Sequence, residues 1–344
     1  MSQKGKQLVT VSDVSDKLGL SRATVSYVLN GKAKEMKISD RTIRRVKEMA
    51  DELGYVPNYF AKVLREKRSK TIGILFASLD LGWAHHVFQG MLDVFDQDSY
   101  IPQMSVHLWD SDRQEREIES FLERQVDGLI CQPIVGCGEL YSRISKRVPF
   151  VQLSDNVLDN DSGSFVAWDS RRAAAIAMEH LIQIGRRRIG FIGAAHGGMT
   201  TPARYEAYEQ TLNRSNLPVT PQWIAWEQPG QSPEGKVRKM FSSSENCPDA
   251  LYCLNDWLAL KVIDVLRSMG IRVPEDVAVI GMSDFYPSSY AGLSTMKEPC
   301  HELGRVAAST ILRAISHPQE LPLHRLITYE KLIVRSTTMN QSDS

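Results

Sequence analysis

The sequence predicts a small all-α head over residues 1–56, a linking segment over residues 57–70, and an α/β body over residues 71–344 with two doubly wound parallel sheets. Three observations lead to this fold class. A chain of 344 residues exceeds what one core usually serves. Residues 1–70 carry 16 Lys and Arg against 8 Asp and Glu, whereas the rest of the chain carries 25 against 33. From Thr71 onward, short apolar runs alternate with helical patterns, which is typical of parallel α/β sheets.

The head begins with two short predicted helices separated by a glycine. Thr10 is placed to cap the first helix because Asp13, three residues later, can complete a capping box. Gly19 ends this helix. Ser21 is placed to cap the second helix, and Gly31 follows its end.

The second helix separates apolar from polar side chains. Its apolar face consists of Val25, Val28 and Leu29, and the side chains that point away are Arg22, Ala23, Ser26 and Tyr27. A third helix is predicted between Ser39 and Gly54, with the apolar residues Ile43, Val46, Ala50 and Leu53 recurring along one face. Pro57 suits the first turn of a further short helix with a basic end.

Six apolar runs in the body are the clearest strand candidates. They are TIGILFA (71–77), DGLICQP (127–133), FVQLS (150–154), RIGFIG (188–193), ALYCL (250–254) and VAVIGMS (277–283). More than one sheet is needed to accommodate this length of alternation. We expect two sheets with a cleft between them, in which ligands lie at the carboxyl ends of the strands.

A helix, a tight turn at Gly19 and a second helix with an outward polar face form the helix-turn-helix pattern. In this motif the second helix enters the major groove of DNA. The basic charge of residues 1–70 fits a polyanionic partner. The sequence therefore predicts a DNA-binding head on an acidic body.

Several other classes of protein lack support in the sequence. The five cysteines show no spacing typical of a metal site, and neither nucleotide-binding nor hydrolase motifs such as GxGxxG, GxxxxGK[ST], GxSxG or HExxH occur where a strand and helix would support them. We interpret His85-His86 as a helix start and the acidic run DNVLDNDSG (155–163) as a turn. We therefore expect no enzyme activity, cofactor or metal. No apolar signal or membrane segment is evident, which predicts a soluble cytoplasmic protein.

The motifs together resemble the lactose-repressor (LacI/GalR) family of bacterial transcription regulators. The likeness covers nearly the whole chain, in family order, through VTVSDVSDKLGLSRATVSYVLNG, RRVKEMADELGYVPN, FAKVL, TIGILF, VDGLI, HLIQIGRRRIGFIG, CLNDWLALKVIDVLRSMGIRVPEDVAVIGMSDF and EKLIVRSTT. The resemblance implies a body of the periplasmic-binding-protein type and a homodimer that binds a pseudo-palindromic DNA operator. It also implies control by a small-molecule effector, such as a sugar or sugar derivative.

The resemblance also implies which residues contact DNA. These are Thr10, Ser21, Arg22, Ala23, Thr24, Ser26, Tyr27, Asn30, Asn58, Ala61 and Leu64. Arg22 suits a bidentate contact with guanine, although a phosphate contact is the alternative, and Ala23 suits a thymine methyl. Leu64 matches the family's apolar wedge in the minor groove, with a core leucine as the alternative. Tyr27 departs from the family, which usually has arginine there.

The residues that the resemblance assigns to the effector are Trp83, Ser154, Arg204, Asn255, Ser283 and Asp284. A guanidinium at Arg204 suits vicinal hydroxyls or a carboxylate, and Trp83 offers a flat apolar face. Ser154 and Ser283 stand where the family usually places carboxylates that hold sugar hydroxyls. Asp284 lies next to Ser283, but adjacent side chains of an extended segment point to opposite faces.

Three alternatives remain open at this point. The regulator could be controlled by a protein partner, or by no effector, because the two expected carboxylates are missing. An α/β enzyme would share the doubly wound core. A free solute-binding protein would share the two-lobed body but has no use for a DNA-binding head.

Overall fold

The computed structural model describes residues 9–57, 63, 68–79, 82–154, 163–194, 200–227, 232–242, 247–328 and 331–339. The chain divides into two compact units, Met1–Ser69 and Lys70–Ser344. Among the described helices, none is both long and apolar enough to cross a membrane.

The first unit contains a three-helix bundle. Its helices are α1 (Val11–Leu18), α2 (Arg22–Leu29) and α3 (Asp40–Leu53). They bury Val14, Val25 and Val46 completely, so the apolar faces predicted from the sequence form the core.

The helix ends form at the predicted residues. Thr10 and Asp13 make a complete capping box on α1, and Gly19 ends that helix in the left-handed conformation at φ 65°. The Oγ atoms of Ser21 and Ser39 accept hydrogen bonds from backbone amides in the first turns of α2 and α3. Each cap satisfies an amide that would otherwise lack a partner, so local sequence fixes the length of each helix.

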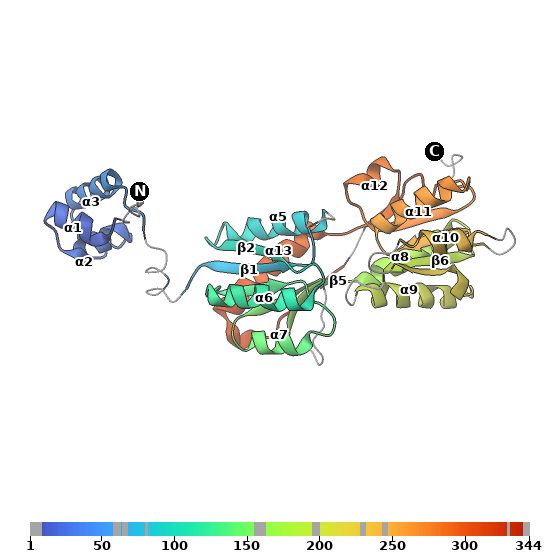
Figure 1. Cartoon of the computed structure of the whole chain (residues 1–344), viewed down its shortest axis with the longest axis horizontal. Coiled ribbons are helices and arrows are strands. Elements are labelled where there is room, and N and C mark those ends of the chain that lie inside the picture. Colours follow the sequence, from blue (N-terminus) through green and yellow to red (C-terminus); the bar gives the residue numbers. More distant parts are fainter. Residues whose placement is uncertain are drawn as a thin grey trace, which may run out of the picture. The chain divides into compact units, whose positions relative to one another are not determined.

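The second unit contains two lobes, each built on a six-stranded sheet (Figure 1). The strand order of lobe 1 is β11-β5-β4-β3-β1-β2. Its elements are β1 (Thr71–Phe76), α5 (Trp83–Phe95), β2 (Ile101–Val106), α6 (Ser111–Glu123), β3 (Gly128–Cys131), α7 (Gly138–Ser145), β4 (Phe150–Ser154), β5 (Ser164–Trp168), α13 (Cys300–Ser316) and β11 (His324–Ile327). All of its strand pairs are parallel.

The strand order of lobe 2 is β12-β10-β9-β8-β6-β7. Its elements are α8 (Ser170–Gln183), β6 (Ile189–Ala194), α9 (Thr200–Arg214), β7 (Ile224–Glu227), α10 (Glu234–Met240), β8 (Ala250–Cys253), α11 (Asp256–Ser268), β9 (Ala278–Ser283), α12 (Tyr286–Tyr290), β10 (Ser294–Lys297) and β12 (Leu332–Ile333). Only the short β12 pairs antiparallel, with β10, among the described strands of this sheet. All six predicted strands are therefore confirmed, as β1, β3, β4, β6, β8 and β9.

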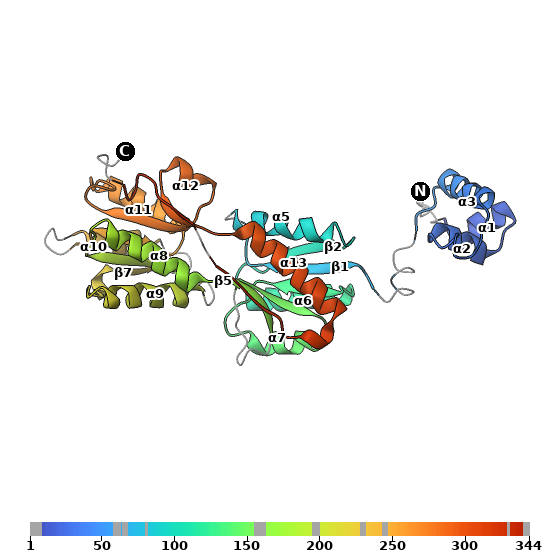
Figure 2. The ribbon, with the colours of Figure 1, turned by 180° about the vertical axis from the view of Figure 1, so that it is seen from behind.

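Helices cover both faces of the lobe 1 sheet. Helices α5 and α13 lie on one face, with α13 in front in Figure 2, and α6 and α7 pack on the other. Backbones of α5 and α13 approach so closely that a Cβ added at Gly304 would lie 1.9 Å from the carbonyl oxygen of Val87. The same test at Gly90 places the added Cβ 1.9 Å from the carbonyl oxygen of His301. Only glycine fits at this helix crossing.

The chain passes between the lobes more than once. It leaves lobe 1 after β5, returns through Glu298 and Pro299 between β10 and α13, and passes again between β11 and β12. Neither lobe is therefore continuous in sequence, and residues from several crossings border both sheets.

Candidate functional site

Helix α2 presents a polar surface in the head. Arg22 and Ala23 are exposed and Tyr27 is half-buried, whereas Val25 and Val28 are buried beneath them. This is the division that the sequence pattern predicts. A helix held by its apolar face leaves the opposite face available for a groove.

The predicted DNA-contacting residues that the structure describes gather on two helix starts and on α2. Thr10 precedes α1, Ser21 precedes α2, and Arg22, Ala23, Thr24, Ser26, Tyr27 and Asn30 lie along α2 or at its end. The guanidinium of Arg22 donates a hydrogen bond to Ser12 Oγ on α1, which joins the two helices. Asn30 Nδ2 donates to the Ser26 carbonyl oxygen at 2.6 Å. Asn58, Ala61 and Leu64 lie outside the described residues.

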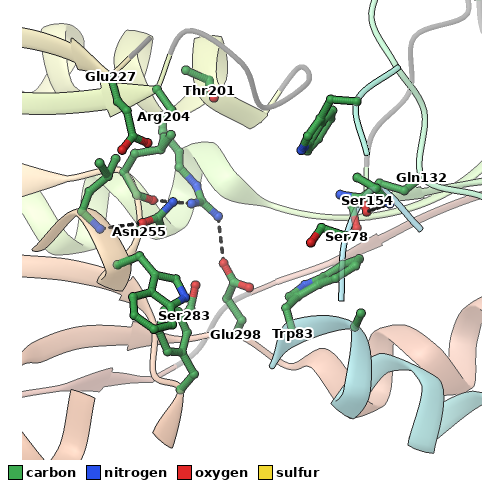
Figure 3. A pocket seen from close by; sticks show the side chains of 18 of the residues that line it. Ser78, Trp83, Gln132, Ser154, Thr201, Arg204, Glu227, Asn255, Ser283 and Glu298 are labelled. Carbon is green, nitrogen blue, oxygen red and sulfur yellow. Dashed lines mark hydrogen bonds and ion pairs between the residues drawn. The ribbon is translucent and has the colours of Figure 1, made fainter. Parts of the chain in front are cut away.

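A cleft of about 560 Å³ lies in the body, within the size range of small-molecule sites. Five of the six predicted effector residues line it: Trp83, Ser154, Arg204, Asn255 and Ser283 (Figure 3). They come from both lobes, since Trp83 begins α5 and Ser154 ends β4 in lobe 1, whereas Arg204, Asn255 and Ser283 belong to lobe 2. The carboxyl ends of the strands thus converge on one cavity, as expected for parallel sheets.

Asp284 does not line this cleft. Its carboxylate accepts a hydrogen bond from the guanidinium of Arg335 at 2.7 Å, and it borders a neighbouring cavity instead. The preceding Ser283 lines both the cleft and the neighbouring cavity.

Arg204 is almost completely buried in the wall of the cleft and holds two partners. One terminal nitrogen donates to the carbonyl oxygen of Leu254 at 2.5 Å, and the other donates to Glu298 Oε1 at 2.9 Å. The side chains of Arg204 and Glu298 are only 5% and 3% exposed. Figure 3 shows the carboxylate of Glu298 facing the guanidinium. The sequence analysis predicted Arg204 as an effector residue but did not predict that the carboxylate of Glu298 would already be paired with it.

Asn255 and Asp256 make hydrogen bonds that connect the start of α11 to neighbouring segments of lobe 2. Asn255 Oδ1 accepts from the backbone N of Leu258 at 2.9 Å and caps α11. The buried carboxylate of Asp256 accepts hydrogen bonds from Thr295 Oγ1 at 2.6 Å, from Ser288 Oγ, and from the backbone N of Asp284 at 2.9 Å. Burial raises the pKa of Asp256 to about 6, although the two hydroxyl donors oppose that rise.

Two strand ends at the cleft adopt unfavourable backbone conformations. Ser154 ends β4 with φ 74°, and Ser283 ends β9 with φ 138°. Each is the fourth strand of its lobe along the chain. Positive φ at a residue other than glycine costs about 1–3 kcal/mol and is concentrated at ligand sites. Their equivalent positions support one shared site between the lobes.

Aromatic residues make up much of the remaining wall. Trp109, Trp168, Trp257 and Phe285 join Trp83 around the cavity. The rings of Trp83 and Trp168 meet edge to face, with their centroids 5.7 Å apart. The sequence analysis predicted only Trp83 among these five residues, because the sequence around the other four does not distinguish them from aromatic residues of an ordinary core. Their one local signal is position, since Trp168, Trp257 and Phe285 each lie at or within a few residues of a strand end.

Comparisons with known proteins match this arrangement. Residues 10–58 match the model of bacterial regulatory proteins of the lacI family, and residues 178–338 match the periplasmic binding protein-like domain. The HTH-type transcriptional repressor PurR of Haemophilus influenzae is 28% identical over 322 residues, which cover 91% of this chain and 93% of that protein.

Solved structures match over nearly the full length. A Lac repressor dimer bound to operator and the anti-inducer ONPF superimposes with a TM-score of 0.83 at 23% identity, covering 97% of this chain and 100% of that one. A complex of the transcriptional regulator CelR with cellobiose gives a TM-score of 0.71 at 22% identity, covering 96% of this chain and 99% of that one.

A helix-turn-helix head joined to a two-lobed body with a central cleft defines a DNA-binding transcription regulator with a sensor domain. The matches over both parts make the relationship specific. The chain therefore carries a DNA-binding domain of the lacI family joined to a periplasmic binding protein-like domain.

Proposed function

We propose that this protein is a homodimeric repressor that reads a pseudo-palindromic operator and responds to a carbohydrate effector. The head over residues 1–56 binds DNA, residues 57–70 form the hinge, and residues 71–344 sense the effector and dimerise. One observation carries the proposal: the same chain joins an exposed polar recognition helix to a cleft lined by both lobes of a separate unit.

The geometry of α2 supports sequence-specific binding in the major groove. Arg22 and Ala23 lie in its first turn, and this is the part of a recognition helix that contacts base edges. The neighbouring caps at Ser21 and Ser39 hold the bundle rigid, which limits the ordering cost on binding. The dimer and the operator are proposed by analogy with the Lac repressor, which was solved as a dimer bound to its operator.

The cleft supports a small molecule as the regulating signal. Its volume and aromatic walls fit a ligand that one lobe alone could not enclose. Differential closure of the lobes would couple ligand and DNA affinity. A carbohydrate is the class that we favour because CelR, which shares the fold, was solved with cellobiose. We place the protein in the cytoplasm with its DNA target, acting by binding rather than by catalysis.

In vitro selection tests the DNA-binding part of this function. The purified full chain would be used to select duplexes from a random library, and the enriched sequences would be aligned. We expect an inverted repeat whose half-sites match a two-fold symmetric dimer. Enrichment of no sequence would contradict the proposal, and an asymmetric single site would contradict the dimer.

A second experiment tests the effector. Electrophoretic mobility shifts on the selected operator would be repeated with a panel of neutral mono- and disaccharides. We expect one of them to change the operator affinity. If no saccharide changes it, control by a protein partner or regulation without an effector becomes the better account.

A further inference from the structure

The charges that line the cleft are paired within the protein. Among the described lining residues, four are charged, and they form two ion pairs. Arg204 pairs with Glu298 at 2.9 Å in the buried wall. Lys261 Nζ pairs with Glu227 Oε1 at 2.8 Å nearer to solvent, with side chains that are 51% and 18% exposed. The described lining therefore carries no net charge for a ligand to neutralise.

The pair of Arg204 and Glu298 is the one that a charged ligand would have to disturb. Taking both groups out of water is costly, and their mutual attraction compensates only while both remain in place. An anionic ligand approaching Arg204 would meet the carboxylate of Glu298 already on the second terminal nitrogen. The guanidinium also lies 6.0 Å from the centroid of the Trp168 ring, so it forms part of a packed wall.

Three uncharged hydrogen-bonding groups of the lining are available to a ligand. Ser154 and Thr201 are 5% and 7% exposed, and their hydroxyls have no hydrogen-bond partner within the described parts of the chain. The buried Nε1 of Trp83 likewise has none there. All three residues line the cleft. A buried polar group without a partner is costly, so these atoms are expected to meet polar atoms of a ligand or water.

These neutral donors stand beside flat apolar rings from both lobes. Trp83, Trp109 and Trp168 belong to lobe 1, and Trp257 and Phe285 belong to lobe 2. Indole faces cover the apolar face of a saccharide ring, and hydroxyl and indole N–H groups bond its oxygens. The combination fits a ligand that has polar edges and apolar faces but carries no charge.

We propose that the cleft selects an uncharged saccharide and rejects acidic and phosphorylated sugars, and that Glu298 sets this selection by occupying Arg204. Glu298 is thus a specificity-determining residue that acts as an internal counterion. This inference rests on the proposed function of the cleft as an effector site. It goes further by naming the charge class of the effector and the residue that excludes the other class.

A thermal-unfolding panel on the full wild-type chain tests the selection itself. Neutral sugars, including glucose, galactose and cellobiose, are compared with the uronates and the 6-phosphates of glucose and galactose. We expect only neutral members to raise Tm, because a ligand that binds the native state stabilises it. A rise in Tm with a uronate or a sugar phosphate, abolished by Arg204→Gln, would overturn the charge selection while leaving the effector site in place. Silence of the entire panel would instead contradict the carbohydrate effector.

The variant Glu298→Gln tests the role of the carboxylate without knowledge of the natural effector. Glutamine keeps the size and a hydrogen-bond acceptor for Arg204 but removes the charge. Inorganic phosphate and glucuronate serve as probes, and titration calorimetry gives their Kd. We expect the variant to bind at least one of them at least tenfold more tightly than the wild type does.

Two control variants locate any gained anion. Glu298→Gln combined with Arg204→Gln should lose the gain, because no buried cation remains. Glu227→Gln removes one negative charge from the same cleft but leaves Arg204 paired, so it should not reproduce the gain. Equal anion affinity in the wild type and in a folded Glu298→Gln would show that Glu298 is not the selecting residue. If Glu298→Gln fails to fold, the wild-type panel alone decides between neutral and anionic ligands.

Discussion

What an individual arginine of this protein can bind depends on the hydrogen-bond or ion-pair partner that it already holds. Arg22 is exposed on α2 yet tied to Ser12, so it is presented to solvent in a defined position. Arg204 is buried and already holds Glu298. The two arginines predicted as binding residues therefore differ in their partners: Arg22 bonds an uncharged hydroxyl, whereas Arg204 is paired with a carboxylate.

At Arg22, replacement by alanine should weaken binding to the preferred operator by about 1–3 kcal/mol and relax the preference at one base pair. The reason is that a guanidinium in the first turn of α2 can bond guanine at two points. Competition binding on operators with single base changes provides the measurement. Arg45→Ala on α3 is a matched loss of charge and should leave base preference unchanged. Equal loss on all duplexes for Arg22→Ala would make Arg22 a phosphate contact.

At Asp256, the unfolding free energy should depend on pH. Burial raises its pKa to about 6 in the folded chain, above the ordinary value of 3.8, so the native state binds the proton more tightly than the unfolded state does. The resulting stabilisation is complete below about pH 4 and is lost as pH rises through about 6. The difference in unfolding free energy between the wild type and Asp256→Asn should therefore fall by about 3 kcal/mol from pH 4 to pH 7. Denaturant titrations of both proteins across this range measure it, and a difference independent of pH would contradict the raised pKa.

At the scale of elements, the predictable parts are those whose signals are local. The caps at Thr10, Ser21 and Ser39 and the stop at Gly19 lie within a few residues of the helices they bound, so the head could be predicted to the residue. The contact between α5 and α13 joins segments more than 200 residues apart in the sequence, and no local sequence pattern predicts it.

The crossing of α5 and α13 should not tolerate a side chain at Gly304. An added methyl would meet the carbonyl oxygen of Val87 at 1.9 Å, so the two helices must separate. We expect Gly304→Ala to lower the unfolding free energy by about 1–3 kcal/mol. Gly235→Ala on α10 is the control, because a Cβ there meets nothing within 4 Å. By helix propensity, this control should be neutral or slightly stabilising. Thermal unfolding compares the two, and equal Tm values would contradict the steric account.

At the scale of the whole molecule, the fold class and the six buried strands follow from the sequence, whereas the edge strands and much of the cleft do not. Strand β2 begins at the exposed Ile101 and contains Pro102, so it lacks the apolar run that marked β1. Arg204 and Asn255 were found through resemblance and position. Glu298 was not predicted because its role depends on the ion pair with Arg204, which lies 94 residues away in the sequence. Charge pairing across such a distance is fixed by tertiary packing alone.

The affinity for the operator and the affinity for the proposed saccharide effector should be linked reciprocally. If a saccharide that raises Tm changes operator affinity by some factor, the operator must change saccharide affinity by the same factor, typically about 5- to 150-fold. Calorimetric titration of the saccharide into the free protein and into the operator complex measures both values. An unrelated duplex serves as the control and should leave saccharide affinity nearly unchanged. Identical affinities for the free protein and the operator complex would show that the cleft and the head are uncoupled.

The repeated crossings between the lobes also determine what an interrupted gene would produce. Strand β11 (His324–Ile327) completes the lobe 1 sheet beside β5, although it lies close to the carboxyl end of the chain. Domains fold as the ribosome releases them, starting at the amino end. The head therefore emerges first, whereas the sensor stays incomplete until almost all of the chain has been made. A premature stop codon before His324 would leave the DNA-binding head attached to an incomplete sensor, which could not respond to the proposed effector.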